Sequence, residues 1–288
     1  PSVMSNSRLS SIVKARFEDR EGYLLRSLGP CNLSMTLESG QAFRWRKLED
    51  GTHEGIVRGK YFRLGQRKDG GITVMNPVTE SELGMMGLNI PAEYGGFGAS
   101  ALLFSRVFGE VGTTDASLAV YFGAHQSIGC KGITLFGTED QKRRWLPQCA
   151  SGERVAAFCL TEPGSGSDAQ AMRAAATLAP EGTHYLLNGE KIWISNAGYA
   201  GVFTVFAKVP VDADGHTKQR VTAFIVDAHA PGITLGKIEA KMGIKASDTR
   251  SVSFANVRVP VEDRVGEVGD GFRIALEILN SGRLGLAA

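Results

Sequence analysis

The sequence predicts an α+β multidomain fold with an antiparallel β-module, a helical segment, a β-barrel-like middle domain and a C-terminal helix. Three observations predict it. Apolar and polar residues alternate over residues 32–74, follow a helical period of about 3.6 from Ser81, and alternate again over residues 155–261. Glycine, at 36 of 288 residues, falls mostly in short clusters that indicate turns and ligand loops.

The chain opens with a basic part. Residues 1–74 hold thirteen Lys and Arg against eight Asp and Glu, whereas the rest of the chain has an excess of acidic residues. A split of this kind can reflect two ancestries. We expect residues 1–21 to be a terminal extension, because they lack the apolar segment of a secretory signal. Residues 22–78 are expected to form the β-module, with turns at pairs such as Asp50-Gly51 between short alternating runs.

Three further divisions follow along the chain. Residues 79–152 have the helical period and are expected to form three helices, one of them capped by Thr138 with Gln141 at its N3 position. Residues 153–263 are expected to form the middle β-domain, because turn signals separate their alternating runs. Residues 264–288 are expected to contain a helix that continues to the last residue.

Composition excludes several classes of protein. With 43% hydrophobic and 22% charged residues, the chain is expected to be neither disordered nor a coiled coil. No apolar run reaches the roughly 18 residues that a membrane span needs, so we expect no membrane partner. The four cysteines lie far apart without a C-x-x-C pair, which argues against a disulfide framework or a metal site and favours the cell interior.

A turn rich in glycine and serine follows the first run of the middle domain. Residues 158–168 read F-C-L-T-E-P-G-S-G-S-D. Successive backbone N–H groups in such a turn can form a concave nest for phosphate oxygens, and the Ser167 hydroxyl adds a donor. A plain surface loop has the same composition. The turn is neither the dinucleotide motif G-x-G-x-x-G nor a P-loop.

A second segment of interest, residues 187–196, reads L-N-G-E-K-I-W-I-S-N. Its Asn188-Gly189 pair predicts a tight hairpin turn that leads into a strand. Alternation along that strand places Trp193 and Ser195 on one face. A tryptophan buried in the core is the alternative interpretation of Trp193.

Together the two segments resemble the middle domain of the acyl-CoA dehydrogenase family, with its signature T-E-P-x-x-G-S-D followed by N-G-x-K-x-W-I-S/T-N. Three more segments match the family in the same order: Ile90–Gly98, Gly137–Pro147 and Lys241–Thr249. The resemblance covers about residues 82–288. It implies a flavoprotein oxidoreductase that α,β-dehydrogenates an acyl-CoA thioester in fatty acid β-oxidation or amino acid catabolism.

The resemblance implies FAD as the cofactor. Backbone groups at the start of the turn and the Thr161 hydroxyl would bond the pyrimidine edge of the flavin, while Trp193 would pack against the ring. Ser195 would bond near N5, the atom at which an oxidised flavin accepts hydride. The implied cofactor contacts are Phe158, Leu160, Thr161, Gly166, Ser167, Trp193, Ile194 and Ser195.

Substrate contacts are implied at Ser167, Leu279, Asn280 and Arg283, although an ordinary helix-end arginine is an equal interpretation of the last. In this family a glutamate takes the α-proton while hydride leaves the β-carbon. That base lies in a C-terminal helical domain in most members, and in a minority at the position of Gly282. Because Glu277 is expected on a solvated face, no catalytic residue is assigned, and weak or absent activity is predicted.

The resemblance also implies partners and a compartment. Besides the acyl-CoA substrate, an electron-transferring flavoprotein is the expected electron acceptor. A homo-oligomer and tight flavin binding are both placed in doubt, because much of the family's C-terminal domain has no counterpart in this sequence. The expected location is the cytoplasm for a bacterial chain and the mitochondrial matrix for a eukaryotic one.

Residues 22–74 resemble instead the N-terminal domain of 8-oxoguanine DNA glycosylases, through S-G-Q-A-F-R-W at residues 39–45 and the strand pattern that follows. The basic residues there suit contact with DNA phosphates, but they equally suit an exposed edge strand kept soluble by charge. The glycosylase's catalytic lysine and aspartate have no counterpart. The chain is thus expected to be a chimera of two truncated parts. Two alternatives to a dehydrogenase remain, a DNA-binding repair module and a non-catalytic fragment that folds poorly.

Overall fold

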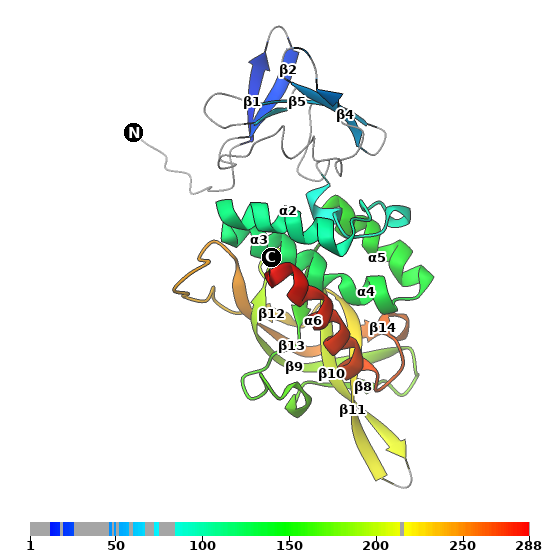
Figure 1. Cartoon of the computed structure of the whole chain (residues 1–288). Coiled ribbons are helices and arrows are strands. Elements are labelled where there is room, and N and C mark those ends of the chain that lie inside the picture. Colours follow the sequence, from blue (N-terminus) through cyan, green and yellow to red (C-terminus); the bar gives the residue numbers. More distant parts are fainter. Residues whose placement is uncertain are drawn as a thin grey trace. The chain divides into compact units, whose positions relative to one another are not determined.

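The computed structural model describes residues 12–17, 20–25, 46–47, 49, 52–57, 60–66, 72–74, 84–213 and 216–287 (Figure 1). The chain divides into two compact units, residues 1–83 and residues 84–288. This division lies close to the boundary expected after residue 78. Within the described residues, no helix has both the length and the apolar character needed to cross a membrane.

The first unit holds a six-stranded sheet in the order β1-β2-β6-β5-β4-β3. All of its paired strands are antiparallel, as the alternating runs predict. The sheet starts earlier than expected, because β1 lies wholly within the predicted terminal extension and pairs with β2. The S-G-Q-A-F-R-W motif lies outside the described residues. The strands are β1 (Ile12–Phe17), β2 (Arg20–Leu25), β3 (Arg46–Lys47), β4 (His53–Val57), β5 (Lys60–Gln66) and β6 (Ile72–Val74).

The second unit opens with helices, but not with the three simple ones that the period predicts. A π-helical stretch, η3, separates two of them, and its Gln126 bonds the backbone of a distant loop by donating to Met85 O (2.6 Å) and accepting from Asn89 N (3.1 Å). Residue periodicity does not report such a change of helical pitch. The segments are η1 (Met85–Gly87), η2 (Ala92–Tyr94), α2 (Ala101–Thr114), α3 (Ala116–Gly123), η3 (Ala124–Gly129), α4 (Lys131–Phe136) and α5 (Glu139–Ser151).

A mixed sheet follows and forms the expected middle β-domain. Its strand order is β12-β13-β9-β8-β10-β11-β14, with β7 parallel to β10, so among the described residues the sheet is open, not closed into a barrel. Phe203 and Phe224 are fully buried in one apolar cluster of this sheet. The strands are β7 (Val155–Cys159), β8 (Ala175–Leu178), β9 (His184–Ser195), β10 (Ala200–Ala213), β11 (His216–Asp227), β12 (Ile233–Leu235), β13 (Thr249–Pro260) and β14 (Arg264–Val265), with the short helices η4 (Ala169–Ala171) and η5 (Val261–Asp263).

The predicted C-terminal helix is α6 (Gly271–Ala287), which contacts η3, α2, α4 and β11 and is drawn in red in Figure 1. Its buried residues Ile274 and Ile278 belong to the same apolar cluster as Ile133 of α4 and Phe206 of β10. That cluster joins the helices to the sheet. Burial of each such side chain stabilises the fold by about 2 kcal/mol.

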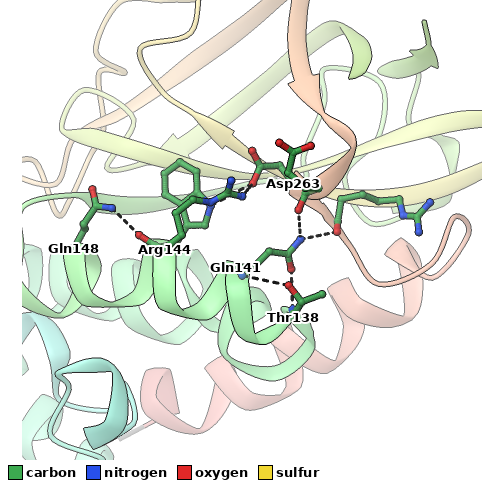
Figure 2. A network of polar contacts seen from close by, with 8 residues as sticks. Thr138, Gln141, Arg144, Gln148 and Asp263 are labelled. Carbon is green, nitrogen blue, oxygen red and sulfur yellow. Dashed lines mark hydrogen bonds and ion pairs between the residues drawn. The ribbon is translucent and has the colours of Figure 1, made fainter. Parts of the chain in front are cut away.

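Polar contacts from α5 complete this junction (Figure 2). The capping box predicted for Thr138 and Gln141 is present, with both reciprocal hydrogen bonds. The Gln141 amide also donates to the carbonyls of Glu262 (2.7 Å) and Arg264 (2.8 Å). One side chain therefore caps its own helix and ties that helix to the end of the β-domain.

Candidate functional site

The glycine-rich turn after β7 is closed by its own backbone. Glu162 N–H donates to Ser165 O (3.0 Å), and Ser165 N–H donates back to Glu162 O (3.1 Å). The buried Ser165 hydroxyl donates to Asp168 O (2.7 Å). Gly166 and Ser167 are exposed, and a Cβ added at Gly166 would meet nothing within 4 Å. The turn is therefore fixed on its inner side and open on its outer side.

The start of the turn lies against β9. Phe158 is half-buried and packs edge-to-face on Phe206 at 5.1 Å, and Leu160 is buried. Thr161 is half-buried, and its carbonyl accepts a hydrogen bond from Ile192 N (2.9 Å). The structure thus brings together the two segments that the sequence separates by some twenty residues.

A buried ion pair lies beneath this contact. Lys191 of β9 is fully buried, and its Nζ donates to Glu162 Oε1 (2.8 Å) and to Leu160 O (3.1 Å). Glu162, 5% exposed, also accepts from the N–H groups of Arg173 (2.6 Å) and Ala174 (3.0 Å). Burial alone would raise the pKa of Glu162, but the hydrogen bonds from Lys191 and Arg173 outweigh it and hold that pKa below its ordinary value.

Neither member of this pair was assigned a role from the sequence. Charged residues are mostly exposed in proteins, so a lysine and a glutamate inside two motifs gave no reason to expect burial. One signal was present in β9, where the apolar run Ile192-Trp193-Ile194 directly follows Lys191. The partner could not have been found from spacing alone.

Trp193 is not a core residue. Its side chain is 63% exposed and its φ is +58°, in the left-handed region. The register with β13 shifts here, because Arg250 pairs with Ile194 whereas Val252 pairs with Lys191, which leaves one extra residue in β9. This is a β-bulge. Ile194 is buried, while Ser195 is half-buried.

Asn188-Gly189 does not form the predicted hairpin turn, because β9 runs through both residues. The opposing strand has the irregularity instead, a bulge at Asn256, whose N–H donates to Asn188 Oδ1 (2.8 Å). Gly189 has a φ of +145°, and a Cβ there would lie 2.6 Å from Ala174 Cβ. A residue pair typical of turns is used here for close strand packing and for filling a bulge.

The implied substrate residues lie on α6. Leu279 is half-buried, while Asn280 and Arg283 are exposed and bonded to each other at 2.9 Å within the helix. Gly282 is buried, and a Cβ there would lie 2.9 Å from Ile128 Cγ2 of η3. Glu277 is exposed and pairs with Arg273 at 3.0 Å, as expected of a solvated face. Within the described residues there is no group of three metal-ligating side chains.

Comparison with known proteins identifies three family matches. The model of the acyl-CoA dehydrogenase middle domain matches residues 157–257, and that of the acyl-CoA dehydrogenase N-terminal domain matches residues 79–153. The model of the 8-oxoguanine DNA glycosylase N-terminal domain matches residues 24–87. The last two matches overlap over residues 79–87.

Relatives and solved structures agree with the first two matches. The very long-chain specific acyl-CoA dehydrogenase of Homo sapiens is 55% identical over 209 residues, which are 72% of this chain and 32% of that protein. An acyl-CoA dehydrogenase of Bacillus anthracis complexed with FAD has a TM-score of 0.66 at 44% identity, covering 71% of this chain and 34% of its own. Butyryl-CoA dehydrogenase of Megasphaera elsdenii has a TM-score of 0.66 at 40% identity, covering 72% of this chain and 54% of its own.

A helical layer on a mixed β-domain, with these two motifs in contact, defines an α+β core of the acyl-CoA dehydrogenase-like fold. Residues 79–257 belong to the acyl-CoA dehydrogenase family, as its N-terminal and middle domains. Both resemblances predicted from the sequence are confirmed. The chain spans about a third of the length of the mammalian relatives that it matches.

Proposed function

We propose that the second unit binds FAD at the 160–168 turn and β9, as part of an acyl-CoA dehydrogenase. The single observation that carries this proposal is Trp193, a large aromatic side chain held 63% exposed by a left-handed backbone beside the open turn. A planar ring system laid on that indole would remove apolar surface from water. The FAD complex of the Bacillus anthracis relative supports the choice of ring.

The donor set of the turn fits FAD. The pyrophosphate needs backbone N–H groups that a side chain does not crowd, and Gly164 and Gly166 have open space where a Cβ would stand. The hydroxyls of Thr161 and Ser195 are both on half-buried residues near the motif contact, where they can donate to the ring edge. When bound, FAD supplies a hydride acceptor. The protein residues bind it and orient it.

Acyl-CoA is the proposed substrate class, because the relatives in both comparisons are named for acyl-CoA thioesters. Ser167, Leu279, Asn280 and Arg283 are the residues proposed to contact it. An electron-transferring flavoprotein is the proposed acceptor. We propose the mitochondrial matrix for a eukaryotic chain, as the name of the human relative suggests, and the cytoplasm for a bacterial one.

Weak dehydrogenase activity is proposed for the 288-residue polypeptide. Glu277 pairs with Arg273, and position 282 is a buried glycine closely packed on η3, so neither provides a carboxylate base. Removal of an α-proton needs a base within hydrogen-bonding reach of it. The polypeptide is therefore proposed to bind flavin but to turn over a thioester slowly. Sedimentation measures whether it forms an oligomer.

Titration of the purified full chain with FAD tests the proposal. We expect saturable quenching of flavin fluorescence with one site per chain, and Trp193→Ala should weaken binding at least tenfold. Leu178→Ala removes an apolar side chain, 45% exposed, from β8 of the same sheet and should leave the affinity unchanged. Absence of binding by the unaltered chain would refute the proposal, as would equal affinities for all three proteins.

A second candidate function rests on the match of residues 24–87 to the glycosylase N-terminal domain. We propose that this unit contacts the phosphate backbone of duplex DNA through its excess of Lys and Arg. Binding of the full chain to a labelled duplex should weaken steeply between about 50 and 200 mM salt. No binding at the lower salt concentration would end this idea without affecting the flavin proposal.

A further inference from the structure

The pair formed by Lys191 and Glu162 joins three segments of the β-domain at one buried point. Lys191 belongs to β9, Glu162 belongs to the turn after β7, and the N–H groups of Arg173 and Ala174 precede β8. A fourth contact, from Lys191 Nζ to Leu160 O, fixes the residue that opens the turn. The proposed contacts to flavin use neither charged side chain.

Such a pair is a poor source of stability. Removing two charges from water costs several kcal/mol per ion, and apolar side chains of similar size are often neutral or stabilising in their place. Here the pair is 0% and 5% exposed, so the cost of desolvation applies almost in full. The ion pair instead fixes the position of the turn, because the Glu162 carboxylate accepts three hydrogen bonds and each comes from a different residue.

The open face of the turn depends on this anchoring. Two successive carbonyls of the turn accept hydrogen bonds from β9. Lys191 Nζ donates to Leu160 O, and Ile192 N–H donates to Thr161 O. On the outer side of the turn, Gly164 and Gly166 have open space where a Cβ would stand. A turn released from these bonds would sample many conformations, and binding would have to order it again.

We propose that Lys191 and Glu162 are positioning residues that hold the 160–168 turn in the form that receives FAD. The inference rests on the proposed function for the identity of the ligand. The holding of the turn itself is a property of the free protein. Preorganisation of this kind raises affinity by lowering the entropy that binding costs.

The test uses the double variant Lys191→Met/Glu162→Gln in the full chain. It removes both charges together, so neither is left buried alone, and the new amide oxygen can still accept from one of the two N–H groups, Arg173 or Ala174, that the two carboxylate oxygens accept from. The matched control is Arg273→Met/Glu277→Gln, which likewise removes one positive and one negative charge, here from an exposed pair on α6. Amide hydrogen exchange over residues 160–174, the FAD dissociation constant and the melting temperature are measured for each protein.

We expect the double variant to stay folded, to exchange amides over residues 160–174 at least tenfold faster, and to bind FAD at least tenfold more weakly. Exchange in β10 and β11 should be unchanged, and the control should match the unaltered chain. Unchanged exchange and affinity in a folded double variant would overturn the inference. Should that variant not fold, Glu162→Asp gives the comparison, because it keeps the buried charge and shortens the reach of the carboxylate, and unchanged exchange there overturns the inference too.

Failure of the proposed function is distinguishable from failure of this inference. If the unaltered chain does not bind FAD, the proposed function fails, while the exchange rates over residues 160–174 still decide whether the pair holds the turn. If the unaltered chain binds FAD but the double variant binds it equally well, the proposed function stands and the positioning role is lost.

Discussion

Arg144 of α5 and Asp263 of η5, 119 residues apart in the sequence, form an ion pair that joins the helices to the end of the β-domain (Figure 2). Trp145 Nε1 donates to the same carboxylate oxygen at 3.3 Å. Burial raises the pKa of Asp263, although the Arg144 guanidinium acts against that rise. The carboxylate thus serves two donors from one turn of α5.

Asp263→Asn is expected to lower the free energy of unfolding by about 1–3 kcal/mol, because charge-assisted hydrogen bonds are lost at a buried position. Urea denaturation measures the change. Glu267→Gln is the control, since Glu267 pairs with Arg264 at the surface, where its side chain is 82% exposed, and should cost less than about 0.5 kcal/mol. Equal losses for the two variants would contradict the role assigned to Asp263.

His125 is expected to make the protein acid-sensitive. It is fully buried, and it bonds Cys149 O at 3.1 Å while accepting from Ala156 N at 2.8 Å. Burial lowers its pKa to about 4, so the unfolded chain takes up a proton near pH 6.5 that the folded chain refuses. The contribution of neutral His125 to the free energy of unfolding is therefore complete above about pH 6.5. It is lost as the pH falls toward 4, which lowers the free energy of unfolding by about 3 kcal/mol.

Urea denaturation at several values between pH 7.5 and pH 4 measures this loss. His125→Gln keeps a donor and an acceptor without a titrating ring, so its stability should change less over that range. His216→Gln, at an exposed position of β11, should behave as the unaltered chain does. A His125→Gln protein with the full loss would show that other groups cause the acid sensitivity.

Gly189→Ala is expected to destabilise the protein by about 3 kcal/mol, because the new methyl group meets Ala174 and the φ of +145° is strained for alanine. Gly182→Ala separates the two causes. Its φ is +70°, but a Cβ there has nothing within 4 Å, so strain alone should cost about 1 kcal/mol. Thermal unfolding compares the two. Similar losses would show that close packing on Ala174 is unimportant.

Ser247→Ala is expected to leave stability unchanged or to raise it by up to about 1 kcal/mol. The Ser247 hydroxyl is buried without a hydrogen-bond partner among the described residues, so its removal relieves a desolvated polar group. Thr204→Val is the contrast, because the buried Thr204 hydroxyl donates to Gly129 O at 2.7 Å, and its loss should cost about 1–2 kcal/mol. A clear loss for Ser247→Ala would reveal an ordered water bonded to that hydroxyl.

Much of the fold follows from local patterns. The capping box of Thr138 and Gln141, the strands of the middle β-domain and the presence of a C-terminal helix depend on residues close in sequence, and all three are confirmed. The Asn188-Gly189 prediction was wrong for a non-local reason. The pair has the preferences of a turn, but Ala174, just before β8, and Asn256 of β13 contact it from distant parts of the sequence.

The candidate site residues could be named from the sequence, and their roles stay predictions, but the contacts that support the turn could not be named. Thr161, Ser167 and Trp193 were proposed from motifs, and the structure adds that Trp193 is exposed on a bulge. Lys191 and Glu162 were passed over because their burial depends on each other. Neither is favourable inside the protein alone, and their separation of 29 positions in the sequence gives no sign of their contact.

The bulge in β9 has one further consequence. Residues two apart in a regular strand point the same way, yet Lys191 is fully buried whereas Trp193 is 63% exposed. The extra residue shifts the alternation of buried and exposed side chains by one position, so positions that would be buried after the bulge are exposed and the reverse. One short motif therefore places an ammonium group in the interior and an indole in solvent. A strand of the same sequence with regular alternation could not keep both the buried lysine and the exposed tryptophan.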